Sequence, residues 1–88
     1  MVDRPSIEAQ IIEVRRELAI RENLYPNWIR QGKLKADEAV RRIEVMAEVL
    51  RTLTTVQQML RLGQFLNELI EEHRQLLPDE PNERITKQ

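Results

Sequence analysis

The chain contains no cysteine, two glycines and three aromatic residues among its 88 residues. Without cysteine it can form neither a disulfide nor a thiolate zinc site, which fits a reducing compartment such as the cytoplasm. Two glycines are too few for a phosphate-binding loop. The 14 basic and 15 acidic residues give a net charge of −1, which argues against a nucleic-acid binder driven by charge alone.

The chain also lacks a long apolar run. Its longest uncharged stretch, residues 52–60, has nine residues and is half polar, whereas a membrane-spanning helix needs about 20 apolar residues. Acidic residues interrupt the first 20 positions, so these positions contain no apolar segment of signal-peptide length. We therefore expect a soluble protein of the cytoplasm.

Charged residues make up 33% of the chain, and apolar residues recur between them at alternating spacings of four and three. This spacing places the apolar side chains along one side of a helix. In the N-terminal part it predicts an amphipathic helix over about residues 4–24, with Asp3 as its N-cap. The apolar row of this helix consists of Ile7, Ile11, Val14, Leu18 and Tyr25.

A corner is predicted at residues 25–32. Pro26 disfavours a helical conformation at the residue before it, so the first helix should end or kink near Leu24. Gly32 suits the left-handed end of a short helical turn. We expect three apolar side chains to fold back over the open end of a helical hairpin: Trp28, Ile29 and Leu34.

The later apolar residues predict either one long helix or two shorter ones. One row predicts a helix over about residues 36–53, and the spacing then resumes in a shifted phase and predicts a helix over residues 55–77. Neither proline nor glycine occurs between residues 53 and 60, so we favour one continuous or gently kinked helix over two helices. The first of these rows consists of Ala39, Ile43, Met46, Leu50 and Leu53.

These elements predict a helical hairpin domain over residues 1–77 and a flexible tail over residues 78–88. The tail contains two prolines and one apolar residue, so it cannot bury a core of its own. The predicted fold class is all-α, a helical hairpin with a long or kinked C-terminal helix.

The first helix is long enough to cover only about half of the second, which leaves the apolar residues of the C-terminal part without a partner in the same chain. We expect a homodimer, arranged as an antiparallel helix bundle, that covers them. If the chain instead bends at residues 54 and 55, the same residues could form the core of a monomeric three-helix bundle. The expected interface consists of Met59, Leu62, Phe65, Leu66, Leu69, Ile70 and Leu76.

No residue pattern in the chain indicates catalysis or a bound cofactor. His73 is the single histidine, and the position three residues before it is Ile70, where the di-iron motif of helix bundles requires glutamate. Ser6 is the single serine and lies at a predicted helix start, so no serine–histidine arrangement is available. We expect no catalytic, cofactor-binding or metal-binding residue and a protein that is not an enzyme.

A basic cluster beside the corner indicates an alternative function. Basic side chains next to an aromatic ring can bind phosphates and stack a base, and both Tyr25 and Trp28 are close by in the sequence. The excess of positive charge is modest, so nucleic-acid binding stays second to protein binding. The candidate contact residues are Arg30, Lys33, Lys35, Arg41 and Arg42.

The corner also has a recognisable sequence. Arg-Glu-Leu-Ala-Ile-Arg at residues 16–21 precedes Tyr-Pro-Asn-Trp at residues 25–28, and Gly-Lys-Leu follows at residues 32–34. A helix with alanine, isoleucine and methionine at positions 39, 43 and 46 comes next. Over about residues 7–53 this arrangement resembles a group of very short helical-hairpin proteins encoded by bacteriophages and prophages, which have no assigned enzymatic activity.

The resemblance implies a phage accessory protein that acts in the cytoplasm of the host cell. Small phage proteins of this kind bind and modulate a host protein, often as inhibitors, so the resemblance implies an unidentified host protein as partner. A nucleic-acid-associated accessory role and a structural coiled-coil scaffold are the alternatives.

Overall fold

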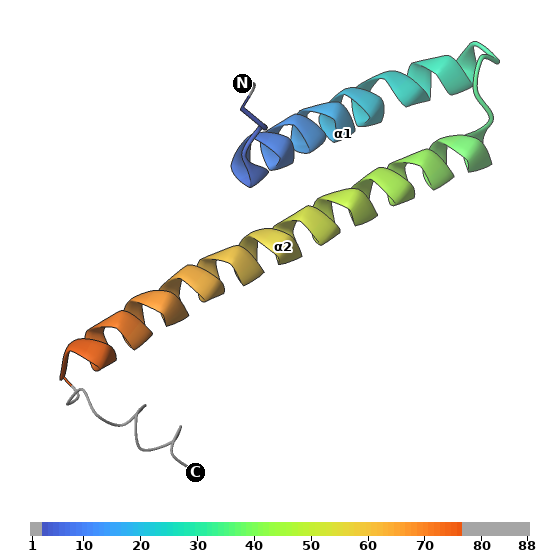
Figure 1. The fold of residues 1–88 in the computed structure, drawn as a ribbon. Helices are drawn as coiled ribbons and strands as arrows, with labels where there is room; N and C mark the ends of the chain where they lie inside the picture. The colour runs from blue at the N-terminus through green and yellow to red at the C-terminus, as the bar shows by residue number, and fades with distance from the viewer. Residues whose placement is uncertain (1–2, 77–88) are drawn as a thin grey trace. The chain divides into compact units, whose positions relative to one another are not determined.

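The computed structural model describes residues 3–76, and within this part of the chain it contains two helices and no strand. Helix α1 spans Ile7–Arg30 and helix α2 spans Ala36–Leu76 (Figure 1). The prediction of an all-α helical hairpin is therefore confirmed. Residues 77–88 lie outside the described residues, and with them the tail predicted for residues 78–88.

The chain divides into two compact units, Met1–Gln58 and Met59–Gln88. In the first unit, α1 lies alongside the N-terminal part of α2 as a hairpin (Figure 1). At the end of this hairpin opposite the corner, Gln57 Nε2 donates to Glu8 Oε2 at 3.4 Å. The first turn of α1 therefore lies beside Gln57, which is near the end of this unit.

The two predicted apolar rows form the inner sides of the hairpin. All ten of their side chains are buried or half-buried, whereas the charged residues between them are mostly exposed. The small core at the corner end is formed by Tyr25, Leu34 and Ala39, with Ile29 and Ile43 packed against it. The alternation of four and three thus gave the correct inner side of both helices in this unit.

Helix α1 begins one turn later than predicted. The Ser6 Oγ accepts the backbone N–H of Ala9 at 3.0 Å, so Ser6 is the N-cap and the prediction of Asp3 as N-cap was wrong. Serine and aspartate cap helices about equally well. A start at Ser6 places Pro5 outside the helix, where its carbonyl oxygen accepts the Gln10 side-chain amide at 3.1 Å.

Helix α1 also continues through Pro26 to Arg30, so the prediction of an end near Leu24 was wrong. A proline inside a helix removes one backbone hydrogen bond and costs about 3 kcal/mol. The extra turn after Pro26 carries Ile29 onto the corner core. We attribute the tolerance of Pro26 to this apolar contact and to the well-satisfied helix end that follows.

The C-terminal end of α1 is closed by a Schellman motif. Gly32 has φ +74°, its N–H donates to the Ile29 carbonyl at 3.1 Å, and the Lys33 N–H donates to the Trp28 carbonyl at 2.8 Å. These are the two bonds that define the motif, which requires a left-handed residue at the position of Gly32. The left-handed conformation predicted for Gly32 is confirmed.

Tyr25, and not Trp28, is the aromatic residue buried at the corner. Tyr25 is 5% exposed, whereas Trp28 is 36% exposed and lies over the tyrosine with ring centroids 5.6 Å apart. The prediction that Trp28 folds back into the core was therefore wrong, whereas Leu34 is buried as expected. Because the helix continues through Pro26, the tyrosine stays on the inner side and the tryptophan, three residues later, lies at its edge.

Helix α2 is a single helix of 41 residues, without a break at residues 54 and 55. Threonine is a weak helix former, partly because its hydroxyl competes for backbone groups. Here the Thr54 Oγ1 donates to the Leu50 carbonyl at 2.9 Å, one turn earlier in the same helix. The hydroxyl is thereby satisfied without leaving the helical conformation.

Replacing Tyr25 should destabilise the hairpin more than replacing Trp28. We expect Tyr25→Ala to lower the free energy of unfolding by about 3 kcal/mol, because it empties the centre of a small core. Trp28→Ala should cost less, since that ring is more exposed. Urea unfolding followed by circular dichroism measures both, and a larger loss for Trp28→Ala would contradict the assignment.

The two glycines should respond in opposite ways to alanine. We expect Gly32→Ala to cost about 1–2 kcal/mol, because an L-residue is strained at φ +74°. Gly63→Ala should stabilise the helix by up to about 1 kcal/mol, since a Cβ there meets nothing within 4 Å. Thermal unfolding of both variants checks this, and a neutral Gly32→Ala would contradict the role of the Schellman motif.

Candidate interaction surface

The second unit presents its apolar side chains without cover. Every residue from Met59 to Leu76 is exposed, and the large apolar side chains among them are 45–82% exposed. All seven predicted interface residues belong to this set, and we call them the C-terminal stripe: Met59, Leu62, Phe65, Leu66, Leu69, Ile70 and Leu76.

The spacing of these residues places them along one side of α2. The positions 59, 62, 66, 69, 73 and 76 alternate by three and four residues, which is the pattern of a helix-packing seam. Phe65 and Ile70 widen the seam on its two sides, as in helices that pack in bundles. His73 occupies one seam position and is exposed, like its neighbours. Leu60, also exposed, falls outside the stripe at 100° per residue.

The charged residues of this unit are unevenly distributed. Residues 59–67 contain one arginine and no acidic residue, whereas residues 68–76 contain three glutamates and one arginine. Arg74 Nη1 lies 3.2 Å from Glu71 Oε1. Among residues 3–76, neither Arg61, Glu68 nor Glu72 takes part in an ion pair. Neither Arg61 nor Glu72 belongs to the apolar pattern of the sequence. Both lie on the Phe65 side of the seam: Glu72 flanks the seam seven residues after Phe65, and Arg61 lies farther from it, four residues before Phe65.

The basic residues at the corner are exposed, but several are already engaged. The Arg30 Nη2 donates to the Asn27 Oδ1 at 2.9 Å, and the Arg42 Nη2 donates to the Glu38 Oε2 at 2.9 Å. A hydrogen bond with the Tyr25 hydroxyl and the nearby Glu38 carboxylate raise the pKa of Arg42. Arg42 is therefore engaged with Glu38 and Tyr25, although its side chain stays half exposed.

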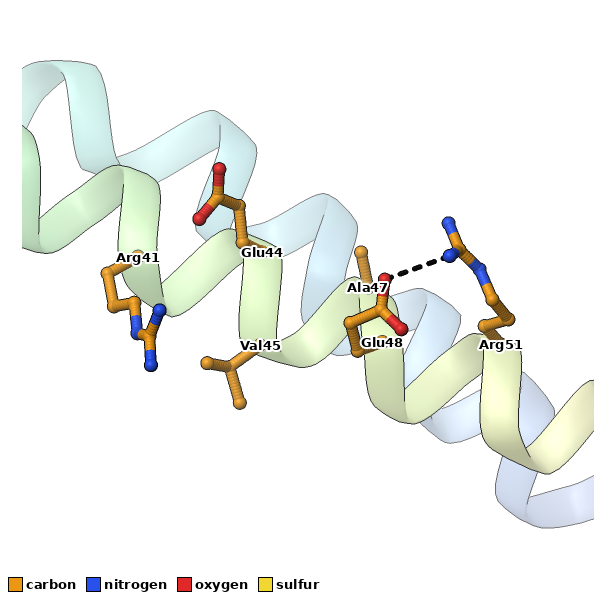
Figure 2. A pocket seen from close by; sticks show the side chains of 6 residues that line it. All are labelled: Arg41, Glu44, Val45, Ala47, Glu48 and Arg51. Atoms are coloured by element: carbon orange, nitrogen blue, oxygen red, sulfur yellow. Dashed lines mark ion pairs between the residues drawn. The ribbon is translucent and has the colours of Figure 1, made fainter.

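Arg41 lies in a shallow hollow on α2 that contains both signs of charge. Figure 2 shows this hollow, which is lined by two glutamates, two arginines and the small apolar side chains of Val45 and Ala47. The dashed line marks the ion pair between Arg51 Nη1 and Glu48 Oε2, which are 3.0 Å apart. Because the two glutamates balance the two arginines, the hollow is not a basic surface for a phosphate backbone.

Among residues 3–76, no three histidine, aspartate or glutamate side chains are placed together to hold a metal ion. Neither helix, within the same residues, is long and apolar enough to cross a membrane.

Comparison with protein-family models, with curated protein sequences and with solved structures gave no match to this chain.

Proposed function

We propose that the chain is a non-enzymatic protein-interaction module that works by helix packing through the C-terminal stripe. Two copies associate through this surface as an antiparallel helix bundle. The observation that supports the proposal is the uninterrupted exposure of seven large apolar side chains on one side of one helix. Patches of this kind mark interaction sites on soluble proteins.

The energetics favour an apolar partner surface. The side chains of the C-terminal stripe are about half exposed, so covering one of them contributes roughly 1 kcal/mol to the free energy of association. Association itself costs about 4–15 kcal/mol in lost translational and rotational freedom. One stripe against a polar surface would not offset this cost, whereas two stripes that cover each other contribute about twice as much. A second apolar helix is therefore the partner surface that suits the stripe.

The proposed biological role is to bind and modulate a host protein, as an accessory protein of a phage or prophage. This part of the proposal depends on the resemblance of residues 7–53 and not on the stripe. Helix-in-groove contacts are the recognition mode that an amphipathic helix of this kind would use. A structural coiled-coil scaffold would use the same stripe without a host partner.

The nucleic-acid alternative has less support. Of its five candidate residues, Arg30 and Arg42 donate hydrogen bonds to neighbouring side chains, and Arg41 lines a shallow hollow together with two glutamates. Lys33 and Lys35 are exposed. Two exposed lysines give little of the phosphate neutralisation on which such binding depends.

Polar substitutions in the stripe should dissociate the assembly. We expect light scattering of wild-type protein to give twice the chain mass of 10.5 kDa. Leu66→Asp combined with Leu69→Asp should return the mass to that of a single chain, because two carboxylates would be buried at the centre of the contact.

The matched control is Val40→Asp combined with Val45→Asp, which changes two apolar residues of α2 within the hairpin that are about half exposed, as Leu66 and Leu69 are. This variant should keep the doubled mass. A wild-type mass of one chain would contradict the proposal. Retention of the wild-type chain on duplex DNA, lost on replacing Arg41 and Arg42 by glutamate, would instead favour the nucleic-acid alternative.

A further inference from the structure

We propose that the second copy on the C-terminal stripe lies antiparallel, with Arg61 of each copy beside Glu72 of the other. This inference depends on the proposed antiparallel self-association and adds its register and the pair of charges that favours it. It follows from the charges that border the stripe, because the apolar residues alone would allow either orientation.

The register follows from the seam. In an antiparallel pair with its two-fold axis between residues 67 and 68, residue 59 of one copy lies opposite residue 76 of the other. Residue 62 then lies opposite residue 73, and residue 66 opposite residue 69. All six seam positions are covered within residues 59–76, and any shift by a heptad would leave some of them exposed. A symmetric pair of this kind repeats each contact twice.

The side of the stripe next to Phe65 carries unbalanced charge. Arg61, Glu68 and Glu72 are spaced by seven and four residues, so they lie on the same side of the helix. Glu68 and Glu72 form a like-charge pair one turn apart, which destabilises a helix. Arg61 has no acidic residue three or four positions away in either direction. The chain therefore leaves a lone cation and two repelling carboxylates along the border of the stripe.

An antiparallel partner resolves this imbalance. The two-fold axis brings the Phe65 side of one stripe against the Phe65 side of the other. In the register above, Arg61 lies opposite residue 74 of the second copy, and Glu72 is two residues away, about 3 Å along the axis. A parallel pair would place the Phe65 side against the Ile70 side, and Arg61 would not meet Glu72.

Charge reversal tests the pairing. We expect Arg61→Glu or Glu72→Arg alone to weaken self-association about 3–10-fold at low salt, because two symmetric attractions become repulsions. The combined variant should recover to within about twofold of wild type. Arg15→Glu, an exposed charge on α1, is the control and should leave the dissociation constant unchanged. Sedimentation equilibrium of these four variants and of the wild type measures the dissociation constants.

Spin-label distances test the orientation independently. The chain has no cysteine of its own, so Gln64→Cys and Gln75→Cys each provide one labelled site, and the two sites lie three turns apart on the same side of α2. In the antiparallel register, the axial separation of the two labels of a pair is about 12 Å greater for position 75 than for position 64. The distance measured between the labels should therefore be longer at position 75.

The outcomes separate the two proposals. A longer distance at position 75, together with recovery in the combined variant, supports the antiparallel pair. A dimer with equal distances at both positions overturns the antiparallel arrangement. A dimer without recovery in the combined variant overturns the pairing of Arg61 with Glu72. Either result leaves self-association through the C-terminal stripe standing. The absence of any dimer in the wild-type protein overturns both.

Discussion

The length difference between the two helices is the constraint on which the rest of this structure depends. Helix α1 has 24 residues and α2 has 41, so at 1.5 Å per residue α1 can cover a little more than half of α2. The hairpin buries four residues, which is a small core for a domain of this size. Apolar residues nevertheless continue along α2, so this chain carries more apolar surface than its own hairpin can bury.

The corner shows how tertiary contacts override local preferences. Pro26 lacks the N–H that α1 would use there, yet the helix continues because the next turn places Ile29 on the core and ends in the Schellman bonds of Gly32 and Lys33. Tyr25 benefits from this continuation. Its ring stays buried between the helices, and its hydroxyl reaches Arg42 at the surface.

Periodicity predicted more of the fold than local propensity did. The inner rows of both hairpin helices and the left-handed Gly32 could be identified from spacing and residue type, because helix geometry fixes which side chains share a side. The N-cap and the end of α1 could not, since Asp3 and Ser6 are both good caps and the cost of Pro26 is offset by packing that only the folded hairpin contains. Trp28 was wrongly predicted to be buried at the corner because the helix was expected to end or kink before it. The residues of the C-terminal stripe could be grouped from their spacing, but the two residues proposed to orient a second copy, Arg61 and Glu72, lie beside it and carry no apolar signal.

Amide hydrogen exchange at two protein concentrations tests most directly whether the stripe is covered by another chain. Helical segments in proteins owe most of their stability to packing of their apolar side. We therefore expect amides in residues 59–76 to exchange more slowly at high protein concentration than at high dilution, while those in residues 36–57 change little. Exchange in residues 59–76 that is fast and independent of concentration would contradict the proposed self-association, because no second copy would then cover the C-terminal stripe.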